Sequence, residues 1–256
     1  MSDVQTESIA ADYTPHPAPG SRARIGLIIL ATDFAAESEI LAMAKTLGDD
    51  VALFVNRIPY KNPVTMASLK AMEGHIVAAT ELIVPPIDLD AVAFACTSGT
   101  AAIGPDKITA LIQGVRPGAA FASPVTGTVL GLQALGARKI ALVTPYPDDV
   151  NDMERDYLEE NGLEVVRMAS FGLTSDTEIS EVPMTAIAEA VKNFDAPEAD
   201  AVFLSCSAFR VIAGIEDMER RIGKPLVTSN QALFWQALRG AGYTDPVAGF
   251  GRLLTL

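Results

Sequence analysis

The sequence is poor in the residues that most often build metal and redox sites. Its 256 residues include only two cysteines, Cys96 and Cys206, and two histidines, His16 and His75. These four residues show no spacing typical of a metal site, so the sequence predicts no bound metal. In a reducing compartment we expect the two cysteines to remain free thiols rather than to form a structural disulfide.

Long apolar segments are also lacking. No apolar run reaches the roughly 18 residues that a membrane-spanning helix needs, and the longest, residues 25–31, suits a buried strand. Residues 1–23 are polar and proline-containing, without the apolar core of a signal peptide. We therefore expect a cytoplasmic protein that does not bind membranes. Residues 1–23 are predicted to form a flexible arm, or an arm that wraps a partner subunit in a homo-oligomer.

Positive charge is scarce, with 19 Lys and Arg against 32 Asp and Glu, which gives a formal net charge of −13. Such a chain is a poor candidate for sequence-independent binding of nucleic acid, which needs clustered basic residues. No glycine-rich G-x-G-x-x-G motif follows a predicted strand, so no nucleotide cofactor is expected. The 49% hydrophobic content nevertheless allows a sizeable core.

What the sequence does contain is a regular alternation of short apolar runs with longer helical stretches. The predicted strands are 25–30, 51–56, 91–95, 119–122, 140–144, 163–169, 201–204 and 225–228, and the predicted helices are 34–47, 63–82, 105–113, 129–135, 149–160, 183–194, 212–222 and 231–239. The strands lack apolar–polar alternation, which is typical of strands buried on both faces. This pattern predicts an α/β fold built from parallel βαβ units.

The second half of the chain resembles the first. Residues 89–98 match residues 199–208 and align Cys96 with Cys206 at an offset of 110 (206 − 96). Three further pairs occur in the same order: Arg57 with Arg167, residues 24–28 with 139–143, and residues 124–126 with 226–228. The repeat predicts two similar Rossmann-like lobes, 24–136 and 137–256, related by a pseudo-twofold axis, with chain ends that can cross between them. The active site is expected in the cleft between the lobes.

Each cysteine follows a predicted buried strand and precedes a helix. In open parallel sheets, ligands bind beyond the carboxyl ends of the strands. Backbone N–H groups and a helix N-terminus at such a position lower a thiol pKa from its usual ~8.5. The neighbouring hydroxyls can donate hydrogen bonds to a carboxylate or a developing oxyanion: Thr97, Ser98, Thr100 and Ser207.

Two thiols facing each other across a cleft suggest two chemistries. One thiol can remove a proton from a planar carbanion centre while the other returns a proton to the opposite face, which gives racemisation or isomerisation. Alternatively, one thiolate adds covalently to an activated double bond and the other manages the proton. Core packing of both cysteines as small apolar residues is the structural alternative.

Several segments resemble the aspartate/glutamate racemase superfamily, in the branch that holds maleate cis–trans isomerase, arylmalonate decarboxylase and the EutA-type ectoine-utilisation proteins. The matching segments are residues 94–100 (FACTSGT), 134–146 (ALGARKIALVTPY), 204–207 (LSCS), 228–235 (TSNQALFW) and 249–254 (GFGRLL). Each is short, but their order and spacing together are fairly specific. The sequence around Cys96 and around Trp235 is most similar to that of the EutA-type proteins.

The resemblance implies roles for individual residues. Cys96 and Cys206 would be the catalytic pair, Thr97 and Ser98 would be oxyanion-binding hydroxyls, and Tyr146 would contact the substrate carboxylate. It also implies chemistry without a cofactor on a small carboxylate substrate. The decarboxylase keeps only the second cysteine, whereas this chain has both, which favours racemisation or isomerisation over decarboxylation.

One segment departs from the family pattern. Maleate isomerases place Pro-Ser-Ser-Asn after the first strand, whereas this chain has Leu30-Ala31-Thr32-Asp33. We expect Thr32 and Asp33 at the substrate. A carboxylate at Asp33 would repel a dicarboxylate and suit a substrate with an amine or amidine, such as a hydroxyectoine-related compound. The structural alternative is that Asp33 caps the following helix.

Several readings stay open at this point. The leading one is a two-cysteine racemase or isomerase of an amino-acid-like carboxylate. The alternatives are maleate isomerisation, decarboxylation of an activated malonate with Cys206 as proton donor, and a non-enzymatic binding protein for a small metabolite. Arg57 and Arg210 could each supply a cation to an anionic substrate or could be surface charges.

Overall fold

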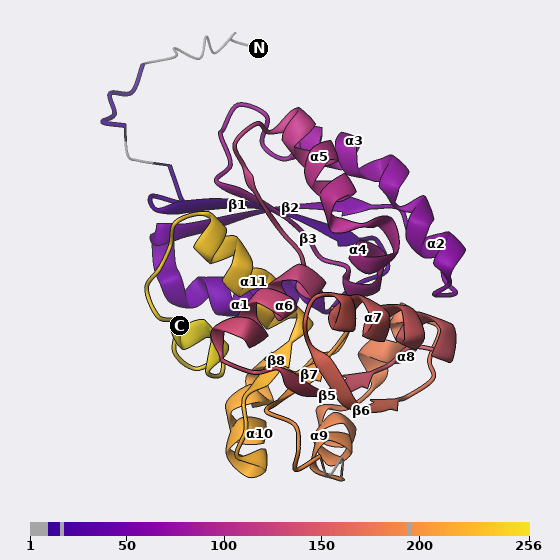
Figure 1. The fold of residues 1–256 in the computed structure, drawn as a ribbon. Coiled ribbons are helices and arrows are strands. Elements are labelled where there is room, and N and C mark those ends of the chain that lie inside the picture. The colour runs from indigo at the N-terminus through magenta and orange to yellow at the C-terminus, as the bar shows by residue number, and fades with distance from the viewer. Residues whose placement is uncertain (1–9, 16–17, 194–195) are drawn as a thin grey trace, which may run out of the picture.

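The computed structural model describes residues 10–15, 18–193 and 196–256. In this part the chain forms two four-stranded parallel sheets with helices packed around them (Figure 1). The described residues of the predicted arm, 10–15 and 18–22, form no helix or strand, and the rest of the arm lies outside the described residues. No helix in the described ranges has the length and apolar character needed to cross a bilayer.

The two sheets repeat one strand order. The first sheet runs β2-β1-β3-β4 and the second runs β6-β5-β7-β8, and every pairing is parallel. The strands are β1 (Ala23–Leu30), β2 (Val51–Ile58), β3 (Ala91–Phe94), β4 (Ala120–Ala122), β5 (Lys139–Thr144), β6 (Glu164–Ser170), β7 (Ala201–Leu204) and β8 (Leu226–Thr228). All eight predicted strands and the predicted α/β class are confirmed.

The helices follow the prediction less closely. They are α1 (Ala36–Ala44), α2 (Met66–Ala71), α3 (Glu73–Leu82), α4 (Thr97–Ile103), α5 (Pro105–Val115), α6 (Pro124–Ala134), α7 (Asp148–Glu160), α8 (Asp176–Glu181), α9 (Met184–Asn193), α10 (Ile215–Ile222) and α11 (Ser229–Gly240), with 3-10 turns at Lys45–Asp50, Ile212–Gly214 and Leu253–Thr255. The predicted helix 63–82 divides at Met72, and the helix predicted from residue 129 begins at Pro124. Phe194, the last residue of the predicted helix 183–194, lies outside the described residues.

Two helices were not predicted, α4 and α8. Both are short, and their first turns are rich in residues with weak helix propensity, such as Thr97, Ser98 and Gly99. An end cap replaces propensity at α4, because the Cys96 sulfur accepts a hydrogen bond from the Gly99 N–H. The consequence for the site is that a helix, rather than a loop, begins directly after Cys96.

Burial differs between central and edge strands. The central strands β3 and β7 are buried at every residue, as predicted for strands covered on both faces. The prediction is wrong for β6, none of whose residues is buried. Because β6 is an edge strand, it has a neighbour on one side only and its outer margin faces solvent.

The two halves of the chain interlock through α6 and α11. Helix α6 ends the predicted first lobe, but its Val125, Val129 and Leu132 pack with apolar residues of β5 and β7 in the second sheet. Helix α11 follows β8 and packs against β3, β4 and α6 (Figure 1). The helices touch at Gly127, where a Cβ atom would lie 2.4 Å from the Ala232 carbonyl oxygen, so only glycine permits this approach.

The strand register tests the proposed internal repeat. Ile25 of β1 lies opposite Ala91 of β3, and Ile140 of β5 lies opposite Ala201 of β7. The first and third strands of the two halves therefore correspond at offsets of 115 (140 − 25) and 110 (201 − 91). These are the offsets predicted for residues 24–28 with 139–143 and for Cys96 with Cys206, and both equivalences are confirmed.

The other two predicted pairs are wrong. Arg57 lies opposite Ile29, near the end of β1, whereas Arg167 lies opposite Ala141, three residues earlier in the corresponding strand. Residues 124–126 begin helix α6, whereas residues 226–228 form strand β8. Short apolar stretches resemble one another in helices and strands, so three matching letters did not identify the register.

Candidate active site

Cys96 and Cys206 occupy equivalent positions in the two sheets. Each is the second residue after its strand, since β3 ends at Phe94 and β7 ends at Leu204. Phe94 lies opposite Ile28, and Leu204 lies opposite the equivalent Val143. The carboxyl end of a central parallel strand is where open α/β sheets bind ligands.

The backbone around Cys96 is that of a regular helix start. Cys96 is extended, with φ −143°, and it forms the N-cap of α4. The Gly99 N–H donates to its Sγ over 3.3 Å, and the Thr100 hydroxyl donates to its carbonyl over 2.7 Å. The Ser98 hydroxyl lowers the pKa of the thiol as well. The N-terminus of α4 therefore surrounds this sulfur with donors.

The backbone around Cys206 is strained. Its φ is +131°, a region that residues with a side chain rarely adopt. An irregular segment follows, and the nearest N–H on the sulfur is that of Ala208, at 3.4 Å. The Tyr146 hydroxyl lowers the pKa of the thiol and so favours its charged form. Tyr146 itself is held by Asn151, whose side-chain amide donates to the Tyr146 carbonyl over 2.8 Å.

Ser229, a residue that the sequence did not single out, joins the two cysteine segments. Its Oγ accepts a hydrogen bond from the Cys206 N–H over 2.8 Å and lies 2.9 Å from the Thr97 Oγ1. Ser229 is the first residue of α11, the helix that crosses onto the first sheet. One serine side chain thus links the backbone of Cys206 to Thr97, the residue after Cys96.

Two carboxylates lie beside the thiols. Asp33 accepts the N–H groups of Ala35 and Ala36 at 2.8 and 2.9 Å, so its side chain binds the start of α1, although the helix begins two residues later than predicted and its N-cap residue is Ala35. Its second oxygen accepts the Ser207 hydroxyl at 2.8 Å, across the two halves. Asp176 of α8 accepts the Thr32 hydroxyl. The predicted residues Thr32, Asp33 and Ser207 are therefore brought together, and Asp176 joins them.

Burial governs the electrostatics of the pair. Burial raises the pKa of Cys96 to about 12, and it raises the pKa of Cys206 well above its usual value. The charges of Asp176 and Asp33 raise both thiol pKa values further. The prediction of lowered thiol pKa values is therefore wrong for this buried site: the N–H donors oppose the shift, but desolvation of a thiolate outweighs them.

Tyr60 is a further residue that sequence reasoning missed. It follows β2 by two residues, the same offset that places Tyr146 after β5. Burial raises the Tyr60 pKa, as do the charges of Cys96, Asp176 and Cys206, in keeping with a phenol near both thiols. The rule that site residues follow strand ends would have found it, had it been applied to β2 as well as to β3 and β7.

The site is closed in this conformation. The exposed fraction is 5% for Cys96 and 6% for Cys206. A hollow of about 180 Å³ lies beside Tyr60 and Met72. The Met72 side chain and the Cys96 sulfur both pack against Gly99, where a Cβ atom would lie 2.3 Å from the Met72 Cε and 2.8 Å from the Cys96 Sγ.

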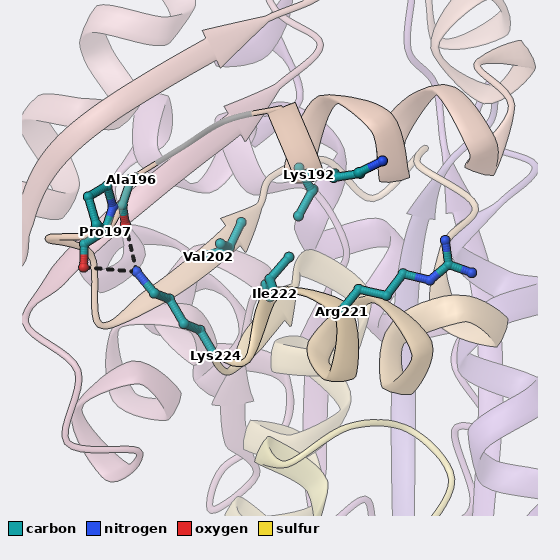
Figure 2. A pocket seen from close by; sticks show the side chains of 8 residues that line it. Lys192, Ala196, Pro197, Val202, Arg221, Ile222 and Lys224 are labelled. Carbon is teal, nitrogen blue, oxygen red and sulfur yellow. Dashed lines mark hydrogen bonds between the residues drawn. The ribbon is translucent and has the colours of Figure 1, made fainter.

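A second hollow, of about 190 Å³, is not part of this site (Figure 2). It is lined by residues such as Val202 and Lys224, and Lys224 donates to the carbonyls of Ala196 and Pro197. Val202 lies in the first half of β7, whereas Cys206 follows the carboxyl end of that strand. Four residues of extended chain span about 13 Å. The hollow therefore lies toward the amino ends of the strands and the thiol lies at their carboxyl ends.

The two candidate arginines do not reach the thiols. Arg57 donates to the carbonyls of Leu30 and Asp33 and forms a 2.6 Å ion pair with Glu37, which ties the end of β1 to the start of α1. Arg210 is exposed. The charged side chains that act on the two thiols are instead the carboxylates of Asp33 and Asp176.

Comparison with known proteins places this geometry in a family. Over 131 residues the chain is 37% identical to the arylmalonate decarboxylase of Bordetella bronchiseptica, an alignment that spans about half of each protein: 50% of this chain and 55% of the relative. It is 27% identical to the maleate isomerase of Geobacillus stearothermophilus over 245 residues, 91% of this chain and 97% of that protein.

The fold comparison agrees. The structure of a mutant Nocardia farcinica maleate cis–trans isomerase with a covalently bound succinylcysteine intermediate matches with a TM-score of 0.82 and 23% identity, over 91% of this chain and 98% of that one. The predicted two-lobed fold and the prediction of an enzyme of this group are confirmed. The model of the arylmalonate decarboxylase family matches residues 90–254, well over half of the sequence and both cysteines, so the chain belongs to that family.

Proposed function

We propose that the protein is a cofactor-independent racemase or isomerase of a small, amino-acid-like carboxylate, with Cys96 and Cys206 as the proton-transfer pair. The observation that carries this proposal is the link through Ser229, which joins the Thr97 hydroxyl beside one cysteine to the backbone N–H of the other. Core cysteines would need neither equivalent strand ends nor this shared contact.

The proposed reaction conserves protons. The sulfur of one cysteine takes the proton from the substrate carbon, and the thiol of the other gives its proton to the opposite face of the same carbon. Between the two transfers the substrate carries an enolate-like charge, which hydroxyls such as Ser98 and Tyr146 can stabilise by donating hydrogen bonds. Because both thiols are buried, the side chains around them must open for the substrate to enter.

The acidic surroundings favour a substrate with a positive group. Asp33 and Asp176 raise both thiol pKa values, so an ammonium or amidinium near these carboxylates would offset their charge and ease thiolate formation. A second carboxylate at the same place would be repelled. The resemblance to EutA-type ectoine-utilisation proteins makes hydroxyectoine-derived compounds the first substrates to test.

Maleate cis–trans isomerisation is the second candidate. It is favoured by the near full-length alignment with a maleate isomerase and by the succinylcysteine intermediate of the Nocardia relative. In that chemistry one cysteine would add to the double bond, rotation about the resulting single bond would follow, and elimination would restore the thiol. Decarboxylation of an arylmalonate is the third candidate and would need only Cys206 as proton donor.

Turnover in D₂O separates these candidates. The purified protein would be incubated with both enantiomers of aspartate and glutamate, a hydroxyectoine-derived amino acid, maleate and phenylmalonate, and followed by NMR and CO₂ release. Deuterium at the α-carbon together with loss of optical activity is the expected result. Fumarate from maleate identifies the second candidate and CO₂ from phenylmalonate the third. Binding without exchange or turnover on the amino-acid substrates contradicts the proposal.

Asp33→Asn tests the inferred substrate charge. Asparagine keeps an oxygen for the N–H groups of Ala35 and Ala36, and the Ser207 hydroxyl can turn to accept from the new amide, so the fold should be retained. We expect maleate turnover to rise and amino-acid turnover to fall, a combined change in preference of about tenfold. An unchanged preference in a variant that melts like the wild type contradicts the role of Asp33.

A further inference from the structure

Glu39 of α1 is a buried carboxyl that the proposed chemistry does not use. It comes from the first half of the chain but binds the second: it accepts the N–H groups of Val211 and Ile212 at 2.5 and 2.8 Å. Its other oxygen accepts the side-chain amide of Asn230 at 2.8 Å. Glu39 is 6% exposed, so these contacts are shielded from water.

The segment that Glu39 binds begins at Cys206. Residues 206–211 form neither helix nor strand, so their backbone N–H groups find no partners within a regular element. Asn230, which contacts Glu39, donates from the same amide nitrogen to the Ser207 carbonyl over 2.8 Å. Glu39 therefore fixes the segment at both ends: directly at Val211 and Ile212, and through Asn230 at the residue after the cysteine.

These contacts matter because the backbone conformation of Cys206 is strained and needs support from its surroundings. A φ of +131° at a residue with a side chain is stable only when surrounding contacts impose it. Besides a turn contact from the Phe209 N–H to the Cys206 carbonyl, side chains of Ser229, Asn230 and Asp33 bind Cys206 and its neighbour Ser207. Glu39 is the group that connects Asn230 to the far end of the same segment.

The corresponding residue of the second half lacks such contacts. Glu154 of α7 follows Glu39 by 115 residues (154 − 39), the offset that relates β1 to β5, and it is also fully buried. Helix α7 packs against α4, the helix after Cys96, whose backbone N–H groups beyond the first turn already donate within the helix. A carboxylate that holds a cysteine segment by its backbone is therefore a feature of the Cys206 side.

We propose that Glu39 is a positioning residue for Cys206: from the opposite half of the molecule it holds residues 206–212 in the conformation that presents the thiol to the site. It touches neither thiol, so it acts through the backbone and Asn230. Its effect on turnover rests on the proposed function, but its effect on the thiol does not.

Selective alkylation of the two thiols tests the proposal without a substrate. Cys96 and Cys206 are the only cysteines, so iodoacetamide labelling can be followed separately in their peptides by mass spectrometry. The test variant is Glu39→Ala. Glu39→Gln keeps only the direct contacts: its amide oxygen can still accept the N–H groups of Val211 and Ile212, but its NH2 group cannot accept from the Asn230 amide. Glu39→Asp keeps the charge but withdraws the carboxylate by about 1.5 Å.

Glu219→Ala is the matched control. Glu219 of α10 is 5% exposed and likewise accepts backbone N–H groups, those of Leu226 and Arg252, but none from residues 206–212. This variant reports what loss of a buried carboxylate from backbone amides does to the molecule in general. We expect it to leave the ratio of Cys206 to Cys96 labelling within twofold of the wild type.

In Glu39→Ala we expect labelling of Cys206 to accelerate at least tenfold while labelling of Cys96 stays within twofold. Glu39→Asp should change in the same direction, which keeps the test available if the alanine variant does not fold. Glu39→Gln, which keeps the contacts with Val211 and Ile212 but loses the one with Asn230, should lie between the wild type and Glu39→Ala. On any substrate that the wild type turns over, Glu39→Ala should lower kcat at least tenfold with KM within threefold.

Three results would overturn the proposal. They are equal acceleration of both thiols in folded Glu39→Ala and Glu39→Asp, a glutamine variant that labels like the alanine variant, and an unchanged kcat in a Glu39→Ala enzyme whose wild type is active. A wild type without turnover on every substrate would refute the proposed function alone, because the labelling ratio would still decide the role of Glu39.

Discussion

Cys96 and Cys206 follow equivalent strands, yet the chain leaves the two strands in different ways. After Cys96 a helix begins at once, and its first turn supplies donors to the sulfur. After Cys206 the backbone is strained and irregular, and side chains from other elements hold it. The duplication has thus kept the position of the thiol and changed its support. Equal positions in a repeated fold do not imply equal roles.

The surroundings of the two sulfurs differ in the same sense. The Tyr146 hydroxyl favours the thiolate of Cys206, whereas the register of the strands places Ala31 at the equivalent position of the first half. Cys96 relies on backbone and on Ser98, and Cys206 relies on a phenol. Both thiols accept a backbone N–H group, but the side chains that favour their charged forms differ, so substitutions can address the two sides separately.

The largest effect is expected from the thiols themselves. If one sulfur removes the proton and the other returns it, Cys96→Ser and Cys206→Ser should each lower racemisation at least about 1,000-fold, since a serine hydroxyl is a far weaker acid and base at neutral pH. Initial rates with both substrate enantiomers measure this. A decarboxylase would tolerate Cys96→Ser far better than Cys206→Ser, and that outcome would break the symmetric reading of the pair.

The second prediction sharpens the contrast between the buried glutamates. Burial raises the pKa of Glu154 to about 7 from 4.5. The folded state then holds a proton that the unfolded state releases, so this contribution to stability is present below pH 4.5 and is lost as the pH rises to 7. In the wild type this group should lower the free energy of unfolding by about 3 kcal/mol between pH 4.5 and 7, which is about 100-fold in the folding equilibrium. Glu154→Gln should abolish this part of the pH dependence.

Urea unfolding at pH 5, 6, 7 and 8 measures this slope. Glu160→Gln is the matched control, because Glu160 lies at the end of the same helix but is exposed. Its stability curve should run parallel to that of the wild type. A Glu154→Gln curve with the wild-type slope would mean that the Glu154 carboxyl is ionised in the fold at pH 5, contrary to the burial of both its oxygens without a hydrogen-bond partner.

Much of the fold could be predicted from the sequence because its signals are local. Central strands such as β3 and β7 are short, apolar and bounded by polar residues, so their positions and the parallel sheets followed. Helix α4 was missed because its stability comes from an end cap and from packing rather than from propensity. The crossing of α6 and α11 was foreseen only as a general option, since it depends on contacts between residues about 100 apart.

The site shows the same division. Cys96, Cys206 and Tyr146 could be selected because they follow strand ends or matched a family segment. Ser229 and Glu39 could not, because a serine at a helix start and a glutamate on an amphipathic helix are common everywhere. Their roles come from contacts across the two halves. The thiol pKa values were mispredicted for a related reason: burial is a property of the assembled fold and not of neighbouring residues.

The smallest of these effects is expected from Tyr146→Phe, which removes the donor that only Cys206 has. A hydrogen bond to a charged group contributes about 1.5–3 kcal/mol, so kcat should fall about 10–100-fold with little change in KM. Cys206 labelling should require higher pH, while Cys96 labelling should not shift. Tyr60→Phe is the matched control, because the Tyr60 hydroxyl contacts Ser68. If both variants shift both thiols equally, the two sulfurs share one network and the contrast between them fails.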